Sequence, residues 1–279
     1  PISVDALETL AVEVAPYDIE FSGFTGGTVN ILTKSGQNDF FGSAYYFKTD
    51  DSMAGDSVNG RDVNQEFDEK TWGVTLGGPI IKDKLFFFAA YEDFEATQLL
   101  DGGDLPGTET GVSQAVYDQV RQITQDTYGF DPLAFGGLDP VTDKKLLATL
   151  DWNINNDHRA KLTYIANEGN EIQPRNNGAD LGSPSTWYDR SEESNAYALQ
   201  TFSDWTPNFS TEVKIAYSEQ ITGQIALAGS DIANFEIETP EGSISVVPDR
   251  FRHANELENE LWQFKVKGEY AYGEPLFKV

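Results

Sequence analysis

The sequence predicts an all-β fold, an antiparallel transmembrane β-barrel segment, and three observations support this prediction. Apolar and polar residues alternate with a period of two in one run after another. The connections between the runs are alternately short and long, which is typical of barrels that cross a membrane. The longest nearly pure apolar run, Leu85 to Tyr91, is far shorter than the ~18 residues of a membrane-spanning helix.

Each alternating run lasts roughly 9 to 13 residues, close to the ~9–11 that a tilted strand needs to cross a bilayer. We expect the apolar face of the runs to point to lipid and Lys145, Lys161, Lys265 and Lys267 to point to the lumen. Aromatic residues make up 13% of the chain, as interfacial girdles of a barrel would require. The residues expected on the lipid side are Trp72, Val74, Leu76, Leu146, Leu150, Trp152, Trp262, Phe264 and Val266.

The connections fall into two classes. Tight turns are predicted at 82–84, 153–158 and 206–208, and long loops at 50–70, 98–143, 171–194 and 225–260. In a barrel, tight turns lie on the periplasmic side and long loops on the outside. A soluble sandwich would instead show a turn signal every ~8–12 residues.

Charge is concentrated in three of the long loops. The chain carries a net charge of −27, and loops 50–70, 98–143 and 225–260 hold 23 acidic and 5 basic residues. Such a charge excludes nucleic acid as a partner, because phosphate binding needs clustered Lys and Arg. The loop acids either keep the surface soluble or attract a ligand. The candidate ligand-facing acids are Asp62, Glu66, Asp68 and Glu69.

One long loop is predicted to contain a helix. Val112, Val116, Val120 and Ile123 recur at helical spacing, and Gly129 suits the position after the last turn. The helix belongs either to an ordered lid or to a small satellite packing unit.

Residues for catalysis or metal binding are scarce. There is no cysteine, and His158 and His253 are the two histidines. A His/Cys zinc site therefore lacks ligands, and neither histidine follows a nucleophile turn. The sequence predicts no enzyme, no metal site and no cofactor.

Residues 26–34 carry the most specific motif of the chain. Gly26, Gly27, Asn30, Thr33 and Lys34, with Ile31, form Gly-Gly-x-x-Asn-Ile-x-Thr-Lys. Together with Leu10 to Pro16, Phe41 to Tyr45 and Leu76 to Phe88, this motif resembles the TonB-dependent outer-membrane receptors, specifically their Oar-like branch. A departure is Val14-Ala15-Pro16, where many of these receptors have Arg-Gly-Pro. We expect Gly26 and Gly27 to lie at a turn too tight for a Cβ.

The resemblance implies a fragment of a barrel of ~22 strands with a plugged lumen. Residues 1–36 would be the C-terminal end of the plug domain, and residues 37–279 about eight or nine strands of the N-terminal part of the barrel. The implied function is TonB-dependent, energy-coupled transport of a large solute across the bacterial outer membrane. The implied partners are outer-membrane lipid, the TonB complex and a solute such as a siderophore, glycan, peptide or protein.

Two further expectations concern the whole protein. The absence of a leader at Pro1 to Leu10 leads us to expect that the true N-terminus, with the segment that contacts TonB, lies outside this sequence. The alternative to a transporter is a secreted acidic β-sandwich or adhesin that binds its target without a pore. The alternation with aromatic ends and the uneven loop lengths favour the barrel over this alternative.

Overall fold

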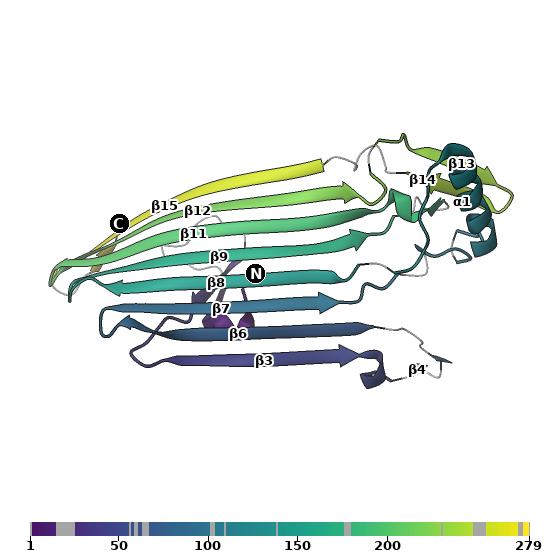
Figure 1. The fold of residues 1–279 in the computed structure, drawn as a ribbon. Coiled ribbons are helices and arrows are strands. Elements are labelled where there is room, and N and C mark those ends of the chain that lie inside the picture. Colours follow the sequence, from purple (N-terminus) through teal and green to yellow (C-terminus); the bar gives the residue numbers. More distant parts are fainter. Residues whose placement is uncertain are drawn as a thin grey trace.

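A single large sheet dominates the computed structural model, which describes residues 2–14, 26–55, 57–58, 61–62, 67–100, 104–108, 110–137, 139–175, 180–229, 231–247, 255–272 and 276–278. The sheet has nine strands in the order β16-β15-β12-β11-β9-β8-β7-β6-β3, and every neighbouring pair is antiparallel (Figure 1). This agrees with the predicted antiparallel barrel segment. Its strands are β3 (Phe41–Asp50), β6 (Asp68–Ile81), β7 (Leu85–Ala96), β8 (Val141–Asn153), β9 (His158–Gln173), β11 (Tyr188–Thr206), β12 (Phe209–Ala226), β15 (Asn255–Ala271) and β16 (Leu276–Lys278).

The connections are short at one end of the sheet and long at the other, as predicted. Residues 82–84, 154–157 and 207–208 make the short turns. The predicted loops 171–194 and 225–260 are shorter in the structure, since β9, β11, β12 and β15 run for 16, 19, 18 and 17 residues. The strands extend past the alternating runs because backbone pairing continues there. Tyr188, for instance, lies opposite both Gln173 and Ala226.

The two faces of the sheet differ in polarity, and the predicted assignment of side chains to them is confirmed. Side chains directly opposite one another in paired strands lie on the same face. One row across six strands is entirely apolar and runs Phe87, Leu150, Leu162, Leu199, Ile215, Phe264. The next row, on the other face, runs Asp151, Lys161, Gln200, Lys214, Lys265.

The apolar face is exposed in this segment. Leu199 is 45% and Phe264 is 71% exposed, and no second sheet covers them among the described residues. Such a face is stable against lipid and unfavourable against water. A secreted sandwich would bury this face, so the alternative prediction does not fit the structure.

Aromatic side chains border the apolar face toward the long-connection end. Three pairs lie there with ring centroids about 5 Å apart: Trp72 and Tyr91 at 5.3 Å, Tyr164 and Tyr197 at 4.8 Å, and Tyr217 and Trp262 at 4.9 Å. Toward the short-turn end, Trp152, Phe209 and Tyr270 are exposed on the same face. Two aromatic bands around an apolar zone are characteristic of outer-membrane barrels. Among the described residues, no helix combines the length and apolarity that a bilayer crossing requires.

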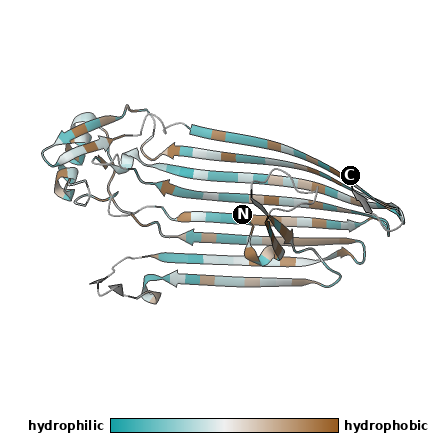
Figure 2. Cartoon of the chain, turned by 180° about the vertical axis from the view of Figure 1, so that it is seen from behind, coloured by the Kyte–Doolittle hydropathy of each residue, from teal (hydrophilic) through white to brown (hydrophobic). Residues whose placement is uncertain are grey.

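A small sheet lies on the polar, inner face. Strands β1 (Leu7–Val14) and β2 (Gly27–Thr33) pair antiparallel, preceded by the short helix η1 (Val4–Ala6). Figure 2 shows the small sheet in front of the inner face of the main sheet. At its base, Ala6 is fully buried against a core formed by Phe88, Ala90 and Leu147.

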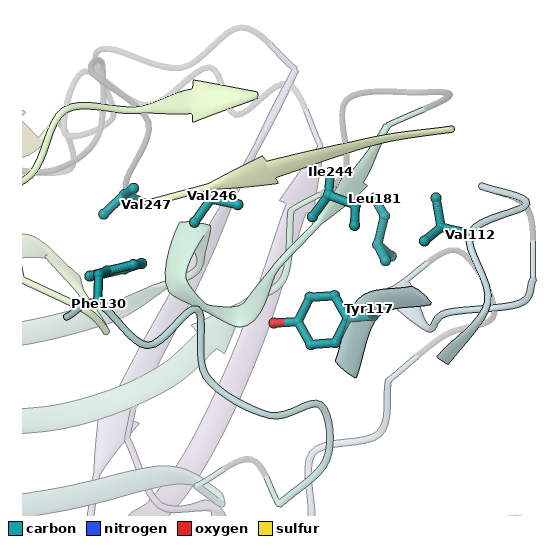
Figure 3. Packing of buried hydrophobic residues seen from close by; sticks show 7 residues of the cluster. All are labelled: Val112, Tyr117, Phe130, Leu181, Ile244, Val246 and Val247. Atoms are coloured by element: carbon teal, nitrogen blue, oxygen red, sulfur yellow. The ribbon is translucent and has the colours of Figure 1, made fainter. Parts of the chain in front are cut away.

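Three of the long connections fold together into one unit at the end of the main sheet (Figure 1). We call residues 104–137, 180–187 and 231–247 the cap. Their buried core is shown in Figure 3 and consists of Val112, Tyr117, Phe130, Leu181, Ile244, Val246 and Val247. The cap elements are α1 (Gln114–Tyr128), β10 (Leu181–Gly182), η4 (Pro184–Thr186), β13 (Phe235–Thr239) and β14 (Gly242–Val246). The connection between β3 and β6 holds η2 (Asp51–Met53), β4 (Ser57–Val58) and β5 (Arg61–Asp62).

The predicted helix is confirmed with one change at its start. Ser113 caps α1 by accepting a hydrogen bond from the Val116 amide, and Gly129 ends it with a φ of 67°. Val112 therefore precedes the helix, and its side chain lies in the cap core. The buried core agrees with the interpretation as a small satellite packing unit, held by contacts between three connections, and a role as a lid stays a prediction.

Candidate functional site

Two of the four acids predicted to face a ligand have described side chains, those of Asp68 and Glu69. Glu66 and the side chain of Asp62 lie outside the described residues. Asp68 and Glu69 begin β6, and their successive positions place them on opposite faces. The Asp68 carboxylate lies 2.9 Å from Lys48 Nζ. A ligand role for the four acids thus remains a prediction.

A polar pocket lies at the long-connection end of the main sheet, and the sequence did not single it out. We call it the mouth pocket; its volume is ≈ 350 Å³. Its walls come from β8, β9, β11 and β12. Most of the lining side chains stand on the inner face, where alternation along β11 places Arg190, Glu192 and Ser194 together. The lining residues with polar or charged side chains include Asp143, Asn167, Glu168, Glu171, Arg190, Glu192, Ser194 and Gln220.

The mouth pocket holds more acid than base. Arg190 is the one basic residue among the described residues that line it. Its Nη2 donates to Glu192 Oε1 at 2.7 Å, and its Nη1 lies 3.9 Å from Glu171 Oε1. Asn167 Nδ2 donates to Ser194 Oγ at 3.2 Å. Since these pairs leave carboxylate and amide oxygens in excess, the pocket suits a ligand that brings cations or hydrogen-bond donors.

Sequence reasoning missed this pocket because residues 171–194 were assigned to a loop. The signal that could have found it was the spacing of Arg190, Glu192 and Ser194 at every second position. That spacing marks one face of a strand even when the other face is also polar.

A second polar cluster fastens the N-terminal segment to the inner wall. We call Ser3, Tyr45, Glu92 and Lys145 the Glu92 cluster. The Glu92 carboxylate accepts hydrogen bonds from Ser3 Oγ at 2.9 Å, Tyr45 Oη at 2.5 Å and Lys145 Nζ at 2.7 Å. Glu92 is only 9% exposed, and buried carboxylates need such partners.

The motif residues of 26–34 contact η1 and β1. Lys34 Nζ donates to the Asp5 carbonyl oxygen at 2.6 Å, and the Lys34 amide donates to the Ala6 carbonyl at 2.9 Å. Asn30 and Thr33 lie in β2, opposite Ala11 and Leu7 of β1. Lys34 therefore joins the end of β2 to η1.

The two glycines of the motif differ in the space that a Cβ would find. Gly27 is the first residue of β2, and a Cβ there would meet the Glu13 carbonyl oxygen at 2.9 Å. The expected lack of space for a Cβ is therefore confirmed at Gly27, although Gly27 lies in a strand. A Cβ on Gly26 would meet nothing within 4 Å, so this expectation is wrong at Gly26.

A second opening lies on the inner face at the short-turn end. It has a volume of ≈ 810 Å³, and its lining includes Arg159, Phe202, Glu212 and Lys267. The Arg159 guanidinium stacks 4.4 Å from the centre of the Phe202 ring. The inner face thus carries a polar hollow near each end.

Of the other groups that could carry chemistry, His158 lines the opening at the short-turn end. The ring of His158 lies 5.1 Å from that of Trp205, and His253 is outside the described residues. The carboxylates of Glu219, Glu258 and Glu260 lie within 4.8 Å of one another on the lipid-side face. Two of the three are exposed, and Tyr217 Oη donates to Glu260 at 3.1 Å. Exposed acids often gather without an ion, and this trio carries no site.

The electrostatics of the cap stabilise its fold. Arg121 donates two hydrogen bonds to Asp131, at 2.7 and 2.8 Å. These bonds lower the pKa of Asp131 to about 2. Because this pKa is depressed in the folded cap, the contribution of the pair is complete above the ordinary aspartate pKa of ~3.9 and is lost as the pH falls toward 2. Burial, followed by Glu236 and Glu238, raises the pKa of Asp180.

Comparison with known proteins places this geometry in a family context. Residues 32–109 match the family model described as "Outer membrane beta barrel domain". Over 98 residues the chain is 36% identical to the TonB-dependent transporter Oar of Myxococcus xanthus, a match that covers 33% of this chain and 9% of that protein. The chain thus spans a small fraction of this curated relative.

Two solved structures are similar in fold. The outer membrane transporter YddB from Escherichia coli superimposes on 99% of this chain with a TM-score of 0.63 and 10% identity, over 34% of its own length. The siderophore receptor PirA from Acinetobacter baumannii superimposes on 88% with a TM-score of 0.50 and 17% identity, over 29% of its length. The chain is therefore a segment of a bacterial outer-membrane β-barrel with a homologue among TonB-dependent transporters. By their names these relatives are transporters and receptors, not enzymes.

Proposed function

We propose that this outer-membrane β-barrel segment belongs to a TonB-dependent transporter that moves a large solute across the outer membrane by energy coupling. In this proposal, residues 1–36 are the end of the plug domain and residues 37–279 the first part of the barrel. One observation carries it: the small β1–β2 sheet is anchored on the polar inner face of a main sheet whose other face is apolar and exposed. A folded segment inside the lumen is what a plug requires.

The partners follow from the same proposal. Lipid contacts the apolar row and its aromatic bands. The TonB complex is the proposed partner in energy coupling. The solute is a siderophore, glycan, peptide or protein, and it is first captured at the long-connection end, where the mouth pocket and the cap lie. Import and export are both compatible with this arrangement.

Plug removal provides the direct test of the pore. In a planar bilayer with KCl, the whole protein should conduct poorly, because the plug fills the lumen. A variant without the plug domain through residue 36 should show large, stable openings. Deletion of cap residues 111–137 is the control and should leave the conductance low. An equally closed channel after plug removal would refute the proposed lumen.

Energy coupling is tested separately with the purified periplasmic domain of TonB. The whole protein in outer-membrane vesicles should bind this domain, and added solute should strengthen binding. If no binding occurs while plug removal opens a pore, the barrel assignment holds and the energised part of the proposal is wrong.

The acidic loops should favour cationic or metal-bridged solutes. Like charges around a mouth raise the capture rate of cations, by ~10-fold or more at low salt. We expect that changing Asp62, Glu66, Asp68 and Glu69 to their amides slows association of a short fluorescent oligolysine peptide with the whole receptor in vesicles. The effect should weaken as salt is added, since the Debye length is only ~8 Å at physiological ionic strength.

A matched control removes the same number of acids at the short-turn end, by amide replacement of Asp39, Asp83, Asp157 and Asp204. This variant should bind the peptide at the rate of the wild type. Equal rates for wild type and the loop variant at low salt would mean that the loop acids only solvate the surface.

A further inference from the structure

One carboxylate connects the N-terminal segment to two strands of the barrel wall. Glu92 stands on the inner face of β7 and accepts hydrogen bonds from Ser3, from Tyr45 of β3 and from Lys145 of β8. Ser3 belongs to the segment that leads into η1 and β1, so its bond crosses from the small sheet to the main sheet. Ser3 is itself 4% exposed, so this contact is closed to water.

The rest of the small sheet touches the wall much less. Val12 is 63% and Val14 is 82% exposed in β1, and Val29 is 60% exposed in β2. Contact with the wall is concentrated at the base, where Ala6 meets the Phe88 core and Lys161 Nζ donates to Ser35 Oγ at 2.9 Å. The β1–β2 sheet is therefore held to the wall mainly where residues 2–6 and Ser35 lie.

The arrangement at Glu92 keeps its charge balanced when Ser3 leaves. Two of the three donors to the carboxylate, Tyr45 and Lys145, belong to the barrel itself. When Ser3 leaves, Glu92 keeps its neutralising ammonium and a phenolic hydrogen bond, so no unpaired charge is left buried. A buried carboxylate that depended on the N-terminal segment for its charge balance would instead resist release strongly.

We infer that Glu92 is a positioning residue that holds residues 2–6 against β7 through Ser3 and whose contact is broken when the β1–β2 sheet moves off the wall. This inference rests on the proposal that residues 1–36 are the end of a plug. It makes the Ser3 contact one of the bonds that hold this boundary, beside those of Ser35 and Ala6, and makes the Glu92 cluster part of the lumen wall once the contact is broken.

The experiment measures, in the whole protein, how accessible residues 2–6 are to a water-soluble reagent. Ala6→Cys introduces a thiol at a fully buried position, in a chain without cysteines of its own. A water-soluble maleimide should label it slowly in outer-membrane vesicles. Glu92→Gln and, separately, Ser3→Ala should each raise the labelling rate roughly 10-fold or more, as expected for loss of a hydrogen bond to a charged group. Ser3→Thr keeps the hydroxyl and should restore slow labelling.

Glu95→Gln is the matched control. Glu95 lies on the same strand, three residues away on the opposite face, and is paired with Lys70 at 2.7 Å. This change should leave the labelling rate unchanged. Ser3→Ala keeps the Glu92–Lys145 pair, so it tests the inference even if Glu92→Gln fails to insert.

Three results would overturn the inference: unchanged labelling in Ser3→Ala, an equal increase in Glu95→Gln, or fast labelling in Ser3→Thr. None of them depends on energy coupling. A protein that fails to bind TonB but shows the expected labelling pattern would contradict the proposed function and leave the inference intact.

Discussion

Replacement of Tyr117 by alanine should unfold the cap while the main sheet stays intact. Tyr117 is fully buried in α1, and its hydroxyl donates to the carbonyl oxygens of Pro132 at 3.1 Å and Leu133 at 2.6 Å. Its ring lies 4.6 Å from that of Phe135. Loss of a buried aromatic side chain costs about 3–5 kcal/mol, to which loss of the hydroxyl donor to the Leu133 carbonyl adds, while the Pro132 carbonyl keeps its bond from the Ser185 amide.

The expected readout is selective proteolysis. In the variant, protease added outside should cut within 97–140, while the barrel remains heat-resistant on a gel. Tyr128→Ala is the control, because Tyr128 lies on the same helix and is 75% exposed. It should change stability by less than about 0.5 kcal/mol. A cap that resists protease in Tyr117→Ala would mean that its three connections do not depend on the shared core.

The barrel strands could be predicted because period-two alternation is a local property. Leu150 and Leu162 alternate with charged neighbours, and this alone fixes which face meets lipid. Their register against Leu199 follows from the same constraint, since a slip of one residue would expose Asp151 or Lys161 to hydrocarbon. A charged side chain in hydrocarbon costs a large free energy, so the alternation of apolar and polar residues has few exceptions in these strands.

The cap could not be predicted beyond its helix, because its core joins positions that are distant in sequence. Leu181 pairs with Ile244 across a parallel contact between β10 and β14, and both pack with Tyr117. Each connection supplies only a few apolar residues, so none shows a periodic signal of its own. The core becomes visible only when the three connections are brought together in space.

The Glu92 cluster was missed for a related reason. Alternation predicts that Glu92 and Lys145 face the lumen, but it does not pair them. The contact with Ser3 crosses 89 positions in sequence, and a serine in an N-terminal segment carries no signal of its own. The mouth pocket differs from the Glu92 cluster, because the spacing of Arg190 and Glu192 is a signal that the sequence does contain.

A cation in the middle of the apolar row should impair the barrel strongly. Leu199 lies between Leu162 and Ile215 on the lipid side and is 45% exposed in this segment. Leu199→Arg places a guanidinium against hydrocarbon, which costs about 2–4 kcal/mol near the bilayer midplane. We expect a lower midpoint in urea unfolding of the whole protein from lipid vesicles, and less protein inserted in cells.

The neighbouring residue provides the control, because its side chain points the other way. Gln200 stands on the inner face, where its amide donates to Glu212 Oε1 at 2.7 Å. Gln200→Arg adds the same cation next to a carboxylate that can pair with it, so the barrel should insert and unfold nearly as the wild type does. Since the two changes are one position apart, any difference between them measures the environment of the two faces. Equal losses would show that Leu199 does not face lipid, and the assignment of every strand in the sheet would reverse with it.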